Sequence, residues 1–315
     1  MSGERATLLQ LNPLSGYLEE GLRQRFNVVR WFELGETERS AWLARCATAV
    51  RAVVAGGQVG CANELMDRLP ALGIIAVNGV GLDKVDLEHA RDRGVRVTST
   101  PDVLTADVAD LAVGLIIALL RAIPAADRYV RSGEWERGDR PLGHTVSGRR
   151  FGIVGLGRIG SALAERLAAF GPVAYTSRQR KAARYEFHSD VKALARASDV
   201  LVVACAATPA THHLVDAAVI ETLGPDGYLV NVTRGSIVDE AAVVAALDTG
   251  RLAGAALDVF ANEPHVPRAL CASPRTVLTP HIASATVETR TRMADLVLAN
   301  LDAFLAAAPL PSASV

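Results

Sequence analysis

The chain has few residues of the kind that form disulfides or structural metal sites. Its 315 residues include only four cysteines, Cys46, Cys61, Cys205 and Cys271. No two of them form a Cys-x-x-Cys pair or any other metal-ligand spacing. We therefore expect no metal site, and we interpret the cysteines as small apolar side chains of a reduced, cytoplasmic protein.

Long apolar runs and an excess of one charge are also missing. The most apolar stretch, 111–120, is too short to span a bilayer and follows Asp102, Asp107 and Asp110, so we expect a buried helix there. The formal net charge of −1 gives no general reason to bind nucleic acid or a membrane. The charged start, residues 1–5, lacks the pattern of a secretory signal peptide.

Apolar residues are nevertheless plentiful, at 50% of the chain, and their pattern alternates between strand and helix. Over the first third of the chain we expect strands at 7–11, 27–31, 51–55, 73–77 and 95–98, and helices near 16–25, 38–49, 63–69 and 86–93. Such repeated units predict a parallel sheet with helices on both faces.

The remainder continues this alternation after a break at Thr100-Pro101. We expect helices at 103–121, 124–131, 161–170, 239–247 and 287–305, and strands at 151–154, 173–176, 200–204, 228–232, 253–259 and 276–278. The stretch 132–147 reads as irregular and contains Trp135, which indicates either an interface or ordinary packing. The tail, 306–315, is expected to fray.

Three glycines follow the strand at 151–154. Gly155 permits a tight turn, Gly157 lets the backbone approach a pyrophosphate, and Gly160 lets helix and strand pack closely. N–H groups at the start of the following helix would complement the phosphates. Strand, turn, helix and second strand together predict a dinucleotide site rather than a plain structural turn. The expected contacts are Gly155, Leu156, Gly157, Arg158, Ile159 and Gly160.

The residues after the second strand lack the acidic side chain that usually holds the ribose 2′-hydroxyl of NAD. Residues 177–181 read Ser-Arg-Gln-Arg-Lys, so a hydroxyl and several cations are available and no carboxylate repels a 2′-phosphate. We therefore predict NADP(H), with NAD(H) less favoured, and place Ser177, Arg178 and Gln179 in the cofactor site. The competing interpretation is a solvated basic loop.

Arg234, Glu263 and His281 each come just after an expected strand. Taken singly, Arg234 is explained as a solvated loop residue, Glu263 as a turn residue, and His281 as a satisfied core histidine. Together they match the reduction of a 2-oxo acid. Arg234 would hold the carboxylate and polarise the carbonyl, and His281 would give the proton. Glu263 would favour the imidazolium and fix the ring, while a nicotinamide brings the hydride.

Further candidates lie at other strand ends, where open α/β sheets bind ligands. After the strand at 73–77, backbone N–H groups could receive a carboxylate, although a flexible connection explains the same residues: Asn78, Gly79, Val80 and Gly81. Gly56 and Gly57 leave room beside a substrate or simply form a turn. Asp258 could receive the nicotinamide amide. The remaining expected cofactor contacts are Pro209, Val232, Thr233, Arg234, His281 and Ser284.

In combination and order, these motifs resemble the D-isomer-specific 2-hydroxyacid dehydrogenases. The resemblance covers nearly the whole chain and is carried by residues 78–83, 100–104, 155–160, 230–240, 256–264 and 279–284. It implies that Arg234 binds substrate, that Glu263 pairs with the acid/base His281, and that Val80 and Gly81 present N–H groups to the substrate carboxylate. Ser177 and Arg178 resemble the branch of glyoxylate/hydroxypyruvate and hydroxyphenylpyruvate reductases.

The resemblance also implies a chain path. We expect two doubly wound parallel-sheet α/β domains with a cleft between them. A flavodoxin-like substrate domain would comprise 1–99 and 286–315, and a Rossmann cofactor domain would comprise 100–285. Family members are dimers through the cofactor domain, which implies a homodimer and brings the Trp135 loop toward the partner's cleft.

The sequence thus favours NADPH-dependent reduction of a small 2-oxo acid, such as glyoxylate or hydroxypyruvate, to the D-2-hydroxy acid. One alternative is an NAD-linked phosphoglycerate dehydrogenase, which the basic loop and the missing regulatory extension after the last helix disfavour. The other is a dinucleotide-sensing binding protein of corepressor type, which would keep the same catalytic residues.

Overall fold

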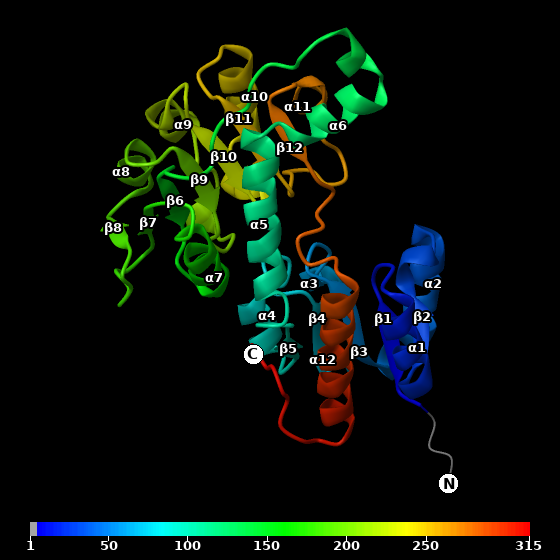
Figure 1. The fold of residues 1–315 in the computed structure, drawn as a ribbon. Helices are drawn as coiled ribbons and strands as arrows, with labels where there is room; N and C mark the ends of the chain where they lie inside the picture. The colour runs from blue at the N-terminus through cyan, green and yellow to red at the C-terminus, as the bar shows by residue number, and fades with distance from the viewer. Residues whose placement is uncertain (1–4) are drawn as a thin grey trace. The chain divides into compact units, whose positions relative to one another are not determined.

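The computed structural model describes residues 5–315, which form two compact units (Figure 1). Unit 1 contains the described part of Met1–Leu104 together with Thr286–Val315, and unit 2 contains Thr105–Ala285. Most of the charged start, on which the signal-peptide interpretation rests, lies outside the described residues.

Unit 1 is a flavodoxin-like α/β domain. Its five parallel strands follow the order β2-β1-β3-β4-β5, which is the doubly wound order with a switch point beside β1. The strands are β1 Thr7–Gln10, β2 Asn27–Arg30, β3 Val50–Gly56, β4 Ile74–Asn78 and β5 Arg96–Thr98. The helices are α1 Gly16–Arg25, α2 Glu36–Cys46, α3 Asn63–Asp67, α4 Leu87–Asp92 and α12 Val287–Leu305.

The side chains of β4 show how the sheet of unit 1 separates two cores. Ile75 and Val77 pack on one face with residues of α2, α3 and α4, whereas Ile74 and Ala76 pack on the other with α1 and α12. Alternation with a period of two produces this division, because successive strand residues point to opposite faces. Both faces are therefore apolar, as expected for a buried parallel sheet.

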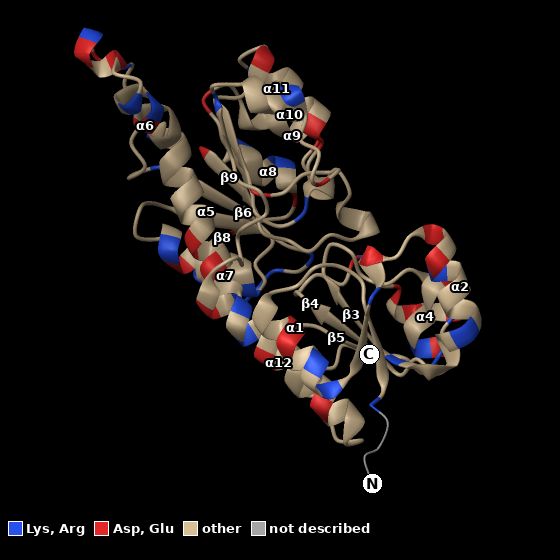
Figure 2. Ribbon diagram, turned by 90° about the vertical axis from the view of Figure 1, so that its right-hand side faces the viewer, with Lys and Arg blue, Asp and Glu red and all other residues tan. Residues whose placement is uncertain are grey.

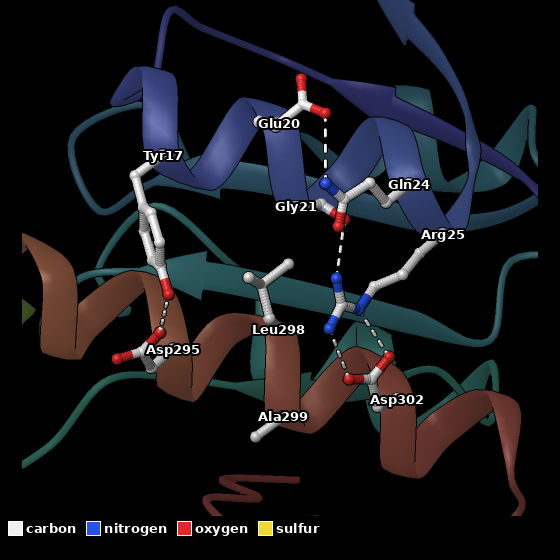
Figure 3. Close-up of a pocket in the computed structure, with 9 residues that line it drawn as sticks. All are labelled: Tyr17, Glu20, Gly21, Gln24, Arg25, Asp295, Leu298, Ala299 and Asp302. Carbon is white, nitrogen blue, oxygen red and sulfur yellow. Dashed lines mark hydrogen bonds and ion pairs between the residues drawn. The ribbon is translucent and has the colours of Figure 1, made fainter.

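Close packing and exposed polar pairs join α1 to α12. A Cβ on Gly21 would lie 2.5 Å from Leu298 Cδ1, so the glycine allows the two helices to approach. On either side, Tyr17 donates a hydrogen bond of 2.7 Å to Asp295, and Arg25 donates hydrogen bonds of 2.7 and 3.0 Å to Asp302 (Figure 3). The polar groups around this groove are thus already paired with one another.

Unit 2 is a Rossmann domain with one added strand. Its seven parallel strands follow the order β12-β11-β10-β9-β6-β7-β8, so two halves meet between β6 and β9. The strands are β6 Phe151–Val154, β7 Val173–Thr176, β8 Glu186–His188, β9 Val200–Val203, β10 Tyr228–Asn231, β11 Gly254–Leu257 and β12 Thr276–Leu278. The helices are α5 Thr105–Leu120, α6 Ile123–Arg131, α7 Arg158–Leu167, α8 Val191–Arg196, α9 Ala217–Leu223, α10 Glu240–Asp248 and α11 Arg268–Ala272.

The expectation that the tail frays is wrong. Ser314 N–H donates to Val97 O at 2.8 Å, and Val97 N–H donates to Val315 O at 3.1 Å. Ser312 Oγ donates to Ser99 O at 2.6 Å, while the buried Asn300 donates to Ser312 Oγ and accepts from Ser312 N–H. The tail therefore lies along the edge of β5 and satisfies its hydrogen bonds there.

Burial supports the interpretation of two cysteines as apolar filler. It raises the pKa of Cys61 to about 12 and that of Cys205 to about 11, so both remain thiols at neutral pH. Cys271, in contrast, is exposed.

No single helix among residues 5–315 is long and apolar enough to cross a membrane. Helices α5 and α6 meet the length and composition criteria only as a pair, and that pair is bent by 60°. The expected burial of α5 is confirmed, because Ala112, Leu115 and Ile116 are almost fully buried.

Candidate active site

The glycine-rich turn lies at the switch point of unit 2, between the ends of β6 and β9. Gly155 has a φ of 101°, and a Cβ on it would lie 2.7 Å from Cys205 Cα. A Cβ on Gly160 would lie 1.9 Å from Gly155 O, whereas one on Gly157 would meet no atom within 4 Å. Packing therefore requires glycine at 155 and 160, while the space over Gly157 stays open.

Helix α7 begins at Arg158, three residues before the expected start at Ser161. Its N-cap is Gly157, which supplies no side-chain cap. Helices α3, α6 and α11 also lack one, whereas α1, α4, α8, α9, α10 and α12 have Ser, Asp or Thr side chains that accept from a first-turn N–H. A helix start without a side-chain cap suits a phosphate, because first-turn N–H groups have no acceptor within the helix.

The loop after β7 is folded back onto its own strand by the buried Tyr175. The phenol oxygen accepts a hydrogen bond from Lys181 N–H at 2.8 Å and donates one to Lys181 O at 3.1 Å. Ser177 Oγ donates to Gln179 O at 2.6 Å, and Arg178 is exposed. The sequence analysis missed Tyr175, which holds the tip of this basic loop.

Arg234 follows β10 in a turn organised by the buried Asn231. Asn231 Oδ1 accepts hydrogen bonds of 3.1 Å from both Thr233 N–H and Thr233 Oγ1, and its Nδ2 donates to Arg234 O at 2.9 Å. A Cβ on Gly235 would lie 2.0 Å from Phe260 C, so the turn packs directly on backbone. In the sequence, this positioning role is indicated only by an asparagine, Asn231, at the end of an apolar strand.

His281 and Glu263 lie side by side in unit 2. His281 Nδ1 is 2.8 Å from Glu263 Oε2 and 3.1 Å from Oε1, and Phe260 N–H donates to Oε1 at 3.0 Å. Burial alone would raise the pKa of Glu263, but the hydrogen bonds from His281 and Phe260 and the charges of His281 and Arg234 hold it below its usual value.

An ionised carboxylate only accepts hydrogen bonds. His281 Nδ1 must therefore carry a proton in this pair, which leaves Nε2 as the ring nitrogen that can gain or lose one. This is the arrangement that a histidine acid/base needs.

Asp258 fixes the loop that carries His281. Its Oδ1 accepts from Thr279 Oγ1 at 2.6 Å and from Ile282 N–H at 2.8 Å, and its Oδ2 accepts from Ala283 N–H at 2.9 Å. Its backbone oxygen accepts from His281 N–H at 2.8 Å, and His281 itself has a left-handed φ of 53°. Such a backbone conformation is costly for a non-glycine residue and persists only when its surroundings enforce it.

The structure places Asn78, Gly79, Val80 and Gly81 in unit 1 and all other candidate site residues in unit 2. Gly79 O accepts from Thr100 N–H at 2.8 Å, which fixes the start of this loop. Val80 is 38% exposed. Among the described residues, no acceptor is hydrogen-bonded to the N–H of Val80 or Gly81.

The other candidate cofactor contacts also follow strand ends of unit 2. Pro209 begins a 3-10 turn after β9, Val232 is buried after β10, and Ser284 is half-buried after β12. Because parallel strands all end at one edge of their sheet, these residues share an edge with Gly157, Arg234 and His281.

The chain matches a known protein family over more than half of its length. Residues 113–283 match the family described as D-isomer specific 2-hydroxyacid dehydrogenase, NAD binding domain. The chain belongs to the D-isomer-specific 2-hydroxyacid dehydrogenases. This confirms the resemblance on which the expected chain path and site residues depend.

Relatives of this dehydrogenase include named reductases. It is 50% identical over 309 residues to the hydroxyphenylpyruvate reductase of Plectranthus scutellarioides, covering 98% of each chain. It is 49% identical over 302 residues to glyoxylate/hydroxypyruvate reductase A of Arabidopsis thaliana, covering 95% of this chain and 96% of the relative.

A solved structure is similarly close. The NADPH-dependent glyoxylate/hydroxypyruvate reductase of Sinorhizobium meliloti, in complex with NADP and malonate, matches with a TM-score of 0.92 and 42% identity. The match covers 99% of this chain and 97% of that one. Similarity on this scale extends over both units of the dehydrogenase and confirms the predicted fold class.

Proposed function

We propose that this dehydrogenase uses NADPH to reduce a small 2-oxo acid, such as glyoxylate or hydroxypyruvate, to the D-2-hydroxy acid. The observation that supports this proposal most directly is the His281–Glu263 pair, with 2.8 Å between Nδ1 and Oε2. This pair leaves Nε2 of His281 available for proton transfer. Named relatives that are glyoxylate/hydroxypyruvate reductases support the reaction class.

The residues of unit 2 fit a dinucleotide. The open space over Gly157 and the start of α7, which has no side-chain cap, would accommodate a pyrophosphate. Ser177, Arg178 and Gln179 would hold a 2′-phosphate, because their loop offers donors and no carboxylate. The remaining contacts, in the loops after β9 to β12, would be Pro209, Val232, Thr233, Asp258 and Ser284. When bound, NADPH supplies the hydride.

The protein's own contribution is position and charge. His281 gives the proton to the carbonyl oxygen from Nε2, while Glu263 stabilises the charged ring. Arg234 holds the carboxylate and polarises the carbonyl by donating hydrogen bonds, and the N–H groups of Val80 and Gly81 donate hydrogen bonds to the substrate carboxylate. In this assignment unit 1 is the substrate domain and unit 2 is the cofactor domain.

Oxidation of NADPH and NADH with a panel of 2-oxo acids tests this function. The panel contains glyoxylate, hydroxypyruvate, pyruvate, phenylpyruvate and 4-hydroxyphenylpyruvate. We expect turnover with NADPH and at least one acid, and a lower kcat/KM with NADH. Tight NADPH binding without oxidation by any acid would refute the proposed reaction.

We also propose a homodimer formed through unit 2. Helix α6 has no buried residue, and exposed apolar side chains occur on it and on the segment that follows. Val130 is 56%, Trp135 63% and Leu142 96% exposed. Figure 2 shows α6 and this segment projecting away from the rest of unit 2. A second copy that covers them would remove this apolar surface from water.

The cytoplasmic location stays a prediction.

A further inference from the structure

Glu240, the first residue of α10, makes a hydrogen bond to a second loop of unit 2. Its Oε1 accepts from Ala261 N–H at 2.6 Å, although the two residues lie 21 positions apart in the sequence. Glu240 is half-buried and Ala261 is exposed. Neither residue has a role in the proposed reaction, so the reaction as proposed does not account for this contact.

The topology of unit 2 explains why the two loops meet. Strands β10 and β11 are parallel neighbours, so the segments that follow them leave the sheet at the same edge. The Arg234 loop, residues 232–240, follows β10 and ends at the start of α10. The Glu263 loop, residues 258–264, follows β11. The hydrogen bond at Glu240 therefore joins the loop of the substrate-binding arginine to the loop of the carboxylate that pairs with the acid/base histidine.

The two loops are also in direct contact through their backbones. A Cβ on Gly235 would lie 2.0 Å from Phe260 C and 2.3 Å from Ala261 N, so the Arg234 loop packs on the peptide bond between Phe260 and Ala261. The N–H groups of these two residues donate to different carboxylates. Phe260 donates to Glu263 Oε1 at 3.0 Å, and Ala261 donates to Glu240. One short piece of backbone is thus held by both loops.

The position of Glu240 is not explained by its helix alone. An acidic residue in the first turn of a helix complements the helix dipole, and the exposed Glu288 of α12 does so from the surface. Glu240 instead lies near another carboxylate. Burial and the charge of Glu263 raise the pKa of Glu240, against the hydrogen bond from Ala261, which lowers it. Attraction to the helix dipole does not require this position near a like charge, whereas a bond between the two loops does.

Loss of this hydrogen bond would loosen the Glu263 loop without disturbing the core. Ala261 is exposed, so water would replace Glu240 as the acceptor of its N–H. The consequence would therefore be a change of position rather than a buried polar group without a partner. Position matters because Glu263 Oε2 is 2.8 Å from His281 Nδ1, and a misplacement of about 1 Å in an active site can reduce the rate about 100-fold.

Resting on the proposed function, we propose that Glu240 is a positioning residue of this reductase. By accepting from Ala261 N–H, it ties the Glu263 loop to the Arg234 loop, so that the acid/base pair and the substrate-binding arginine keep one arrangement. Glu240 acts through Glu263 on His281 and takes no part in proton transfer itself.

This role has a signature in the pH dependence of the reaction. Reduction requires the protonated ring of His281, and a correctly placed Glu263 favours that charged form. When Glu263 is loosened, the ring loses its proton at lower pH, so the alkaline limb of kcat against pH moves to lower pH. Charged groups beside this pair include Arg234 and Glu240, and Asp258 holds the loop of His281. Of these, only Glu240 differs among the variants of the test.

Three substitutions of Glu240 separate its hydrogen bond from its charge. Glu240→Ala removes the acceptor, and Glu240→Gln keeps an oxygen acceptor without the charge. Glu240→Asp keeps the charge on a side chain that is one methylene shorter and falls short of Ala261. Each variant is compared with wild type as kcat against pH, at saturating NADPH and with the 2-oxo acid of the panel that wild type reduces fastest. The Kd for NADPH is measured alongside.

We expect kcat to fall about tenfold in Glu240→Ala and Glu240→Asp, with the Kd for NADPH within about twofold of wild type. The midpoint of the alkaline limb should fall by about half a pH unit in both. Glu240→Gln should keep kcat within about threefold of wild type, because its oxygen still accepts from Ala261 N–H. Asp248→Ala, at the exposed last residue of α10, is the control and should behave like wild type.

A wild-type kcat in Glu240→Ala would overturn the inference. A lower kcat with an unmoved alkaline limb would overturn it as well, because the effect would then not pass through Glu263 and His281. If Glu240→Gln behaves like Glu240→Ala while Glu240→Asp behaves like wild type, the charge acts and the hydrogen bond does not, which also refutes the positioning role. Should Glu240→Ala fail to fold, Glu240→Asp provides the same comparison.

Failure of the proposed function is a separate result. If wild type oxidises NADPH with none of the acids, the proposed reaction is refuted and the positioning role falls with it. That outcome is seen in wild type before any variant is measured, so the two failures are distinguishable.

Discussion

Two carboxylates hold His281 from different directions. Glu263 accepts from the ring nitrogen Nδ1, and Asp258 accepts from the backbone and from Thr279 around the loop. One carboxylate therefore sets the proton position on the ring, and the other sets where the ring lies. Glu263 and Asp258 carry the same charge, but Glu263 has a chemical role and Asp258 has a positioning role.

Replacing His281 by alanine should abolish most of the turnover. General acid catalysis contributes about 10²–10⁴-fold, so we expect kcat to fall by a factor in this range while the Kd for NADPH stays close to that of wild type. Steady-state kinetics and fluorescence titration measure the two quantities. His89→Ala, on the surface of unit 1, is the control, and unchanged kcat in His281→Ala would refute the mechanism.

The ion pair should make stability depend on pH in one direction. The pKa of Glu263 in the folded protein is held below its usual value of 4.5. The pair therefore contributes fully to stability above pH 4.5. This contribution is lost as pH falls through the lowered pKa that Glu263 has in the folded protein. We expect Glu263→Gln to lower the free energy of unfolding by about 1.5–3 kcal/mol at pH 7.

Urea denaturation of wild type and Glu263→Gln at several pH values measures this effect. The difference between the two proteins should shrink below pH 4.5. Glu221→Gln, at an exposed position of α9, should show no such difference. A difference that grows on acidification would contradict the assignment of Glu263 as ionised in the folded state.

Arg178 should distinguish the two nicotinamide cofactors. Because its guanidinium would bind only the 2′-phosphate, Arg178→Ala should raise the KM for NADPH about tenfold or more and leave the KM for NADH nearly unchanged. The exposed Lys192→Ala of α8 is the control for a general loss of positive charge. Equal losses with both cofactors would mean that Arg178 does not bind the 2′-phosphate.

At the scale of elements, buried strands were the most predictable feature. The strands at 151–154, 173–176 and 276–278 and the helix at 287–305 match the structure at both ends, because each is bounded by turn residues or by a change of period. Helices α8, α9 and α11 were missed, although α8 and α9 are no shorter than α3 and α4, which were predicted, and α11 is as long as α3.

The site was predictable in its chemistry and less so in its supports. Residue types and strand ends were sufficient to propose Arg234, Glu263 and His281. The supporting roles of Asn231, Asp258 and Tyr175 depend on hydrogen bonds to neighbouring loops, which only the folded chain defines. The docking of the tail was missed for the same reason, because its partners Ser99 and Asn300 lie far away in sequence.

Docking of the tail should depend on Asn300. Alanine at this position removes three hydrogen bonds made by a fully buried amide. We expect the free energy of unfolding to fall by about 1–3 kcal/mol and hydrogen exchange to rise in the last residues of the chain. Thr291→Ala, at an exposed position of the same helix, should lie within about 0.5 kcal/mol of wild type. Unchanged exchange at Ser314 and Val315 would contradict the role of Asn300.

At the scale of the whole molecule, the exposed apolar surface of α6 predicts self-association. Size-exclusion chromatography with light scattering should give twice the mass of one chain. Val130→Asp, on α6, should shift the protein toward the single-chain mass, because a dimer that buries this side chain would bury an unpaired charge. Leu305→Asp, with a similar exposure in unit 1, should not. A single-chain mass for wild type would refute the proposed dimer.

The chain path also has a consequence for biosynthesis. Unit 2 is one uninterrupted segment, whereas unit 1 is assembled from both sides of it. All of unit 2 therefore leaves the ribosome before α12 does, and until then α1 alone covers the face of the unit 1 sheet that α1 and α12 share. We expect unit 2 to fold first during synthesis. The earlier part of unit 1 would then remain a client for chaperones until the last helix arrives to close its core.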